Sequence, residues 1–86
     1  MVTVRLFAAL REIAASSQVE AEGTTAGEVA DALSARFGER FGQIAAVGSL
    51  VVNGERATRS TPVAAGDEVA LLPPVSGGSP QRNSRA

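Results

Sequence analysis

The hydrophobic positions of the N-terminal third follow two different periods. Residues 2–7 place apolar side chains at every second position, which is the spacing of a β-strand with one buried face. Residues 8–15 are rich in alanine and predict one or two helical turns. Residues 18–22 alternate again, and the short connection predicts that this second strand runs antiparallel to the first.

A longer helix is predicted over residues 25–37 by its start, its end and its period. Thr25 and Glu28 have the spacing of a capping box, in which each side chain accepts a hydrogen bond from the main chain of the other. Gly38 stands where a glycine commonly ends a helix. Residues 39–47 predict a short helical or irregular connector. The apolar residues at helical spacing are Val29, Ala30, Leu33 and Phe37.

The C-terminal half predicts three more strands. Residues 50–52 are apolar and lead into Asn-Gly at positions 53–54, the dipeptide typical of a two-residue hairpin turn. Residues 55–58 form the short returning strand. Residues 67–72 predict the last strand, and the proline pair at 73–74 ends it because proline donates no main-chain hydrogen bond.

This order of elements predicts an α+β fold, with one main helix packed on one face of a mixed sheet of four to five strands. We expect the first and last strands to lie parallel at the centre of the sheet, an order of strands that the pattern alone does not fix. Residues 79–86 have no apolar period and predict a disordered end. The sheet residues expected to face the helix are Val2, Val4, Leu6, Leu50, Val52, Val69 and Leu71.

The residue types missing from the chain exclude most catalytic chemistry. The 86 residues suit one small domain and include no cysteine and no histidine, and all eight basic residues are arginine. We therefore expect no enzyme acting alone, no catalytic residue and no metal site. A net charge of −1 argues against nucleic-acid binding. No apolar run is long enough for a signal sequence or a membrane span, so we expect no membrane association and a cytoplasmic protein.

Gly77 and Gly78 are the candidate reactive element of the chain. A glycine pair is weak evidence by itself, and a flexible linker is the alternative interpretation. Its position adds weight, because it follows the last predicted strand and the rigid proline pair at 73–74. Two glycines can lie extended in a narrow channel where any Cβ would clash. An enzyme that acts on a carboxyl terminus needs such a channel.

Several segments together resemble one known family. They are VRLFAALRE at 4–12, the capped helix, VNGE at 52–55, GDEVA at 66–70 and above all PPVSGG at 73–78. Over residues 2–78 the chain is similar to MoaD, the small sulfur-carrier subunit of molybdopterin synthase, which has a ubiquitin-like, ThiS-like β-grasp fold. The proline pair resembles MoaD more than the thiazole carrier ThiS, whose ending usually lacks it.

The resemblance implies a carrier whose chemistry lies in its main chain. Gly78 matches the terminal glycine that an E1-like, MoeB-like enzyme adenylates with ATP and that then becomes a thiocarboxylate. Val75, Ser76 and Gly77 match the tail that threads into a MoaE-like large subunit, which supplies the catalytic residues. There the sulfur passes to cyclic pyranopterin monophosphate in molybdenum cofactor biosynthesis. No stably bound cofactor is implied.

The chain continues beyond the point where that family usually ends. Residues 79–86 follow Gly78, so the Gly78 carbonyl belongs to an amide and cannot be adenylated as a free carboxylate can. We therefore expect a carrier domain, residues 1–78, and a removable extension, residues 79–86, that a peptidase cuts off. A copy that is inactive in sulfur transfer is the other possibility.

Three apolar residues are predicted on the sheet face away from the helix. Phe7 points there by alternation along its strand, and Val51 and Leu72 point there because their neighbours belong in the core. Apolar residues on an open sheet face suggest a docking patch for the large subunit. Ordinary exposed apolar surface is the alternative.

Two other functions fit the same residues. A related sulfur carrier for cysteine or thiazole synthesis uses the same glycine chemistry with a different partner. A β-grasp interaction domain never carries sulfur, and its glycine pair is only a linker.

Overall fold

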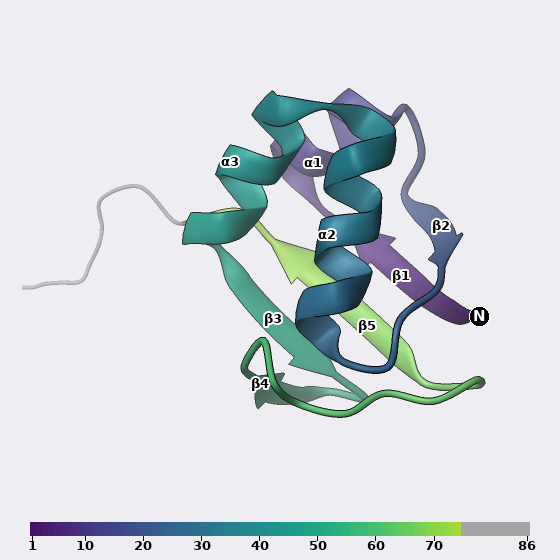
Figure 1. Cartoon of the computed structure of the whole chain (residues 1–86). Helices are drawn as coiled ribbons and strands as arrows, with labels where there is room; N and C mark the ends of the chain where they lie inside the picture. Colours follow the sequence, from purple (N-terminus) through teal and green to yellow (C-terminus); the bar gives the residue numbers. More distant parts are fainter. Residues whose placement is uncertain (75–86) are drawn as a thin grey trace, which may run out of the picture.

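The computed structural model describes residues 1–74, which form one mixed sheet with helices packed against it (Figure 1). The strands are β1 (Val2–Leu6), β2 (Gln18–Ala21), β3 (Ser49–Val52), β4 (Glu55–Ala57) and β5 (Glu68–Leu72). The helices are α1 (Ala8–Ala14), α2 (Ala26–Phe37) and α3 (Glu39–Val47). In this part of the chain, no helix is long and apolar enough to cross a membrane.

The sheet has the expected parallel pair at its centre, and the structure supplies the strand order that the sequence pattern leaves open. Its strand order is β2-β1-β5-β3-β4. β1 and β5 run parallel, with Val4 beside Val69 and Leu6 beside Leu71. The other neighbours, β1 with β2, β3 with β5 and β3 with β4, are antiparallel. The first and last strands therefore lie side by side inside the sheet, each with a neighbour on both edges.

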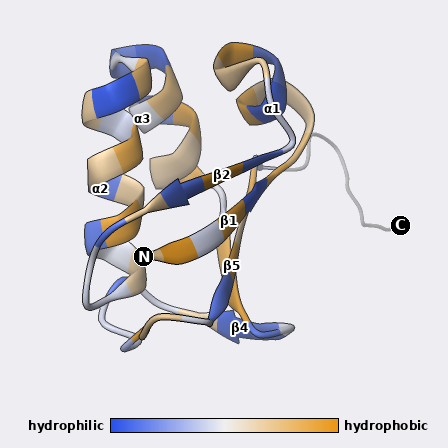
Figure 2. Cartoon of the chain, turned by 90° about the vertical axis from the view of Figure 1, so that its right-hand side faces the viewer, coloured by the Kyte–Doolittle hydropathy of each residue, from blue (hydrophilic) through white to orange (hydrophobic). Residues whose placement is uncertain are grey.

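The core lies between the sheet and the helices α2 and α3, which cover one of its faces (Figure 2). The predicted register is confirmed, since all seven sheet residues expected to face the helix belong to this core or pack against it. Each fully buried apolar side chain contributes roughly 1.5–3 kcal/mol. Of these seven residues, Val2, Val4, Leu6, Val69 and Leu71 are buried, and Leu50 and Val52 are half-buried.

The segment 39–47 is a regular helix, α3, and not an irregular connector. Its Phe41 is 0% exposed, and the ring centroid lies 5.3 Å from that of Phe37, within the range of favourable aromatic pairs. Gly38 joins α2 to α3 with a φ of 105°, which glycine adopts without steric cost, and its N–H donates to Ser34 O at 2.8 Å. This tight corner lets α3 lie back over the core.

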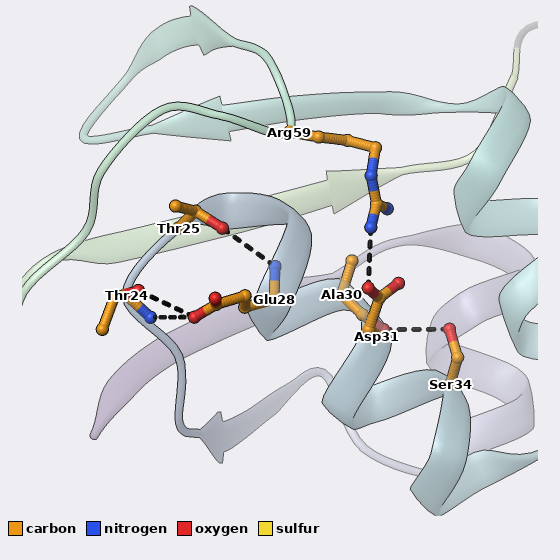
Figure 3. Close-up of polar contacts among 7 residues, drawn as sticks. All are labelled: Thr24, Thr25, Glu28, Ala30, Asp31, Ser34 and Arg59. Atoms are coloured by element: carbon orange, nitrogen blue, oxygen red, sulfur yellow. Dashed lines mark hydrogen bonds and ion pairs between the residues drawn. The ribbon is translucent and has the colours of Figure 1, made fainter.

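The start of α2 is held by two side chains that accept hydrogen bonds from the main chain (Figure 3). Thr25 Oγ1 accepts from Glu28 N at 3.2 Å, as predicted. Glu28 Oε1 accepts from Thr24 N at 2.7 Å and from Thr24 Oγ1 at 2.8 Å. The second half of the capping box is therefore displaced by one residue, from Thr25 to Thr24. These hydrogen bonds hold the pKa of Glu28 below its ordinary value, and the bond from Thr24 N has the largest effect.

We predict that Glu28→Gln lowers the free energy of unfolding at neutral pH and that this difference disappears in acid. The folded state binds the Glu28 proton less tightly than the unfolded state does. The stabilisation is therefore present above about pH 4.3, the ordinary pKa of glutamate, and is lost as the pH falls through the lower folded-state value. Urea unfolding of both proteins between about pH 3 and pH 7 measures the difference.

The matched control is Glu22→Gln, which removes an exposed carboxylate just before this cap. A pH-dependent loss of the same size in both variants would contradict the role of the Thr24–Glu28 bonds.

The β3–β4 turn is joined by hydrogen bonds to the start of β5. Asn53 has φ 51° and Gly54 has φ 84°, the pattern of a type I′ hairpin turn. Asn53 Nδ2 donates to Asp67 Oδ1 at 3.2 Å, and Asn53 Oδ1 accepts from Glu68 N at 3.0 Å. Ala64 N also donates to Asp67 Oδ2 at 2.9 Å. This bond has the largest effect in lowering the pKa of Asp67, and the bond from Asn53 adds to it. Asn53 is thus more than the turn residue that the sequence predicts.

We predict that Asn53→Gly lowers the free energy of unfolding by about 1 kcal/mol, since the turn is kept and two exposed hydrogen bonds are lost. Asn53→Asp keeps the acceptor for Glu68 N but places a second carboxylate beside Asp67. This variant should therefore regain stability on acidification. Chemical denaturation at two pH values measures both effects, and wild-type stability in both variants would contradict the bridging role.

Candidate functional site

The ends of β1 and β5 lie at the same edge of the sheet because these strands are parallel. Phe7 directly follows β1 there, and Leu72 ends β5. We call Leu72 and the prolines at 73–74 the tail root, since the sequence continues from them to the glycine pair. The predicted reactive and threading residues, Val75, Ser76, Gly77 and Gly78, lie outside the described residues, as does the extension 79–86. Their roles and the domain division at residue 78 stay predictions.

A shallow hollow of about 300 Å³ lies on the sheet face opposite α2, and we call it the outer hollow. The strand register explains its shape. Ala70 of β5 stands between Val51 on β3 and Arg5 on β1, and its single methyl group leaves the middle of this row open. The residues that line the outer hollow are Arg5, Phe7, Val51, Gly54, Glu68 and Ala70.

Two of the three residues of the predicted docking patch line this hollow. Phe7 is 37% exposed and Val51 lies across the sheet from it. Phe7 stands at the N-terminus of α1 rather than inside β1, and its carbonyl accepts a hydrogen bond from Leu10 N at 3.1 Å. Leu72 shares the face by alternation, but it pairs with Ser49, is half-buried and is not part of the lining. The role of all three in binding stays a prediction.

The rim of the outer hollow is polar, and the place of Arg5 in it was not predicted from the sequence. Arg5 Nη1 donates to Glu68 Oε2 at 3.4 Å, and both side chains are about half exposed. Such a pair contributes roughly 0–1 kcal/mol to stability and leaves both groups accessible to a partner. An apolar centre with a polar rim is typical of protein–protein interfaces. The sequence could have indicated this, because Arg5 lies two residues before Phe7 and side chains at that spacing in a strand face the same side of the sheet.

A second hollow of about 300 Å³ lies on the helical side, between α2, α3, β3 and β4. Two polar contacts lie along it. Arg59 Nη2 donates to Asp31 Oδ2 at 2.7 Å, and the Ser34 hydroxyl donates to Ala30 O at 2.9 Å (Figure 3). The outer hollow is the better candidate site because Phe7 and Val51 give it an apolar centre and because it lies beside the edge at which β1 and β5 end.

The fold and the edge from which the tail leaves define the class of the chain. A mixed five-stranded sheet with a parallel central pair, followed in sequence by Gly-Gly, is characteristic of small ubiquitin-like β-grasp proteins. Residues 4–78 match the ThiS family, and the chain belongs to this family of ubiquitin-fold sulfur carriers and modifiers. The family is not itself catalytic. The matched region ends at the second glycine of the pair.

Similar proteins and structures cover nearly the whole chain. Small archaeal modifier protein 1 of Haloferax volcanii is 41% identical over 85 residues, covering 86% of this chain and 97% of that protein. A chain in the Amycolatopsis orientalis BexX/CysO complex is 27% identical with a TM-score of 0.75, over 91% of this chain and 100% of the other. A chain in the complex of molybdopterin-converting factor subunits 1 and 2 from Helicobacter pylori is 25% identical with a TM-score of 0.58, over 90% and 97%.

Proposed function

We propose that this chain is a sulfur carrier whose Gly78 carboxyl group is adenylated and then converted to a thiocarboxylate. The carboxylate displaces pyrophosphate from ATP on an E1-like enzyme, and sulfide from a donor then displaces AMP from the acyl group. The observation that carries the proposal is the family match, which extends to residue 78 and stops there. The carrier needs no catalytic side chain, because its reactive group is the main-chain carboxyl. We expect this chemistry in the cytoplasm.

For the acceptor we propose cyclic pyranopterin monophosphate, bound to a MoaE-like large subunit. The sequence PPVSGG at 73–78 and the similarity to a chain of the molybdopterin-converting factor complex support this choice.

The relatives also support a second candidate function. The 41% identity to a modifier protein favours a use of Gly78 in which its acyl group is joined to another protein. The similarity to a chain of the BexX/CysO complex keeps a carrier for cysteine synthesis as a third possibility.

The extension at 79–86 has to be removed before Gly78 can react. While Ser79 follows, the Gly78 carbonyl is an amide, and attack on ATP requires a free carboxylate. We propose that a peptidase releases these residues. The cut leaves the fold intact, because every residue of the described core lies between Val2 and Leu71.

For the docking site we propose the outer hollow. It lies on the sheet beside the edge from which the tail continues, so one partner can hold the hollow and receive the tail together. Phe7 and Val51 supply apolar area, and Arg5 with Glu68 supplies polar groups at the rim.

We predict that residues 1–78 acquire a thiocarboxylate with the activating enzyme, ATP and sulfide, and that residues 1–86 do not. Intact mass spectrometry measures this, since sulfur in place of oxygen adds a known increment. Gly78→Ala in the shorter chain should slow charging, because its methyl group meets a channel shaped for glycine. Equal charging of both lengths without a peptidase would contradict the role of the extension.

The reaction products then distinguish between the proposed acceptors of the Gly78 acyl group or its sulfur. With a large subunit and cyclic pyranopterin monophosphate, sulfur should leave the carrier as molybdopterin forms. Covalent joining of the carrier to other proteins, without sulfur transfer, would favour the modifier function.

We predict that Phe7→Asp weakens binding of the partner by about 10-fold or more, because the new carboxylate is hydrated in the free protein and loses water in the complex. Isothermal titration calorimetry with the activating enzyme or the large subunit measures the affinity. Ala65→Asp is the control, since it adds the same charge at an exposed position in the loop before β5. Unchanged affinity for Phe7→Asp would reject the outer hollow as the docking site.

A further inference from the structure

Gly48 lies between α3 and β3, directly beside the end of β5. Its φ of −90° and ψ of −158° are extended, so the main-chain conformation does not demand glycine. Glycine is required at this position because there is no space for a side chain. A Cβ on Gly48 would overlap the carbonyl oxygen of Leu72, and it would lie 3.0 Å from the Leu72 carbonyl carbon and 3.2 Å from Pro73 Cα. These are main-chain atoms, which cannot rotate away as the end of a side chain can.

This close approach occurs at the tail root, where other constraints also meet. Leu72 pairs with Ser49 on one side, and Leu71 pairs with Leu6 on the other. Pro73 then has a fixed φ and no N–H to donate. The strand pairing, the glycine contact and the proline ring together restrict the direction in which the chain leaves the sheet.

We propose that Gly48 is a positioning residue that sets the direction of the tail root and so places Gly78 in the activating enzyme. The inference rests on the proposed function, in which that enzyme acts on Gly78. Residues 75–78 span at most about 14 Å, so the direction at Pro73 limits where the acyl carbon arrives. Once a partner holds the outer hollow, the fold cannot turn to compensate. A misplacement of about 1 Å costs roughly 100-fold in rate.

Gly42 provides the matched control. It lies inside α3, and a Cβ there would meet only Cβ and Oγ of Ser34, both at 3.1 Å. Both contacts are tight by a few tenths of an ångström, so α2 and α3 have to move apart slightly, but no main-chain atom of β5 is involved. Gly42→Ala therefore adds the same methyl group to the neighbouring helix without reaching β5.

The test measures adenylation of carriers that end at Gly78, by pyrophosphate release with the activating enzyme. We expect Gly48→Ala to lower kcat roughly 10- to 100-fold, with KM changed less than about 3-fold because the outer hollow is intact. Gly42→Ala should keep the wild-type kcat. Circular dichroism and Tm show which variants are folded at the assay temperature, so that a loss of kcat in folded protein separates positioning from stability.

A second variant covers the case in which Gly48→Ala does not fold. Pro73→Gly frees the tail root without adding volume, and we expect it to lower kcat while the circular dichroism spectrum stays native. The inference is overturned if folded Gly48→Ala, or in its place Pro73→Gly, is adenylated at the wild-type kcat. If the wild-type chain ending at Gly78 is itself not adenylated, the proposed function fails first, and this inference fails with it.

Discussion

The parallel pairing of β1 with β5 is the constraint on which the arrangement of this protein depends. Parallel neighbours end at the same edge of a sheet, so the pairing brings the residue after β1 and the end of β5 together. Val4 and Val69 in this pair are 0% exposed, and Leu6 and Leu71 are 1% exposed. A shift of one residue would move these side chains to the opposite face, and the cost of exposing them holds the register.

The two faces of the sheet follow from that register. One face is covered by α2 and α3 and supplies the core (Figure 2). On the other face, Arg5, Phe7, Val51 and Ala70 line a hollow. The core and the proposed docking site therefore use alternate residues of the same strands. A substitution at an outward position such as Val51 can change binding with little effect on the core.

Local hydrogen bonds order the connecting segments that lie outside the sheet. Thr24, Thr25 and Glu28 hold the start of α2, and Asn53 joins the hairpin turn to the beginning of β5. These hydrogen bonds are exposed to solvent, so each contributes little by itself. Their common effect is to order the loops at one end of the sheet.

The sequence by itself determined the strands, the main helix, the face that each apolar residue occupies and the hairpin turn at Asn53, because these depend on neighbours within a few positions of the chain. Only the tertiary structure decided that residues 39–47 form a full helix around Phe41, that Leu72 lies outside the outer hollow, that Asn53 reaches Asp67, and that Gly48 faces the end of β5. Those features join residues far apart in the chain, and no local period records such contacts. The close contact that requires glycine at position 48 exists only once β3 and β5 are paired.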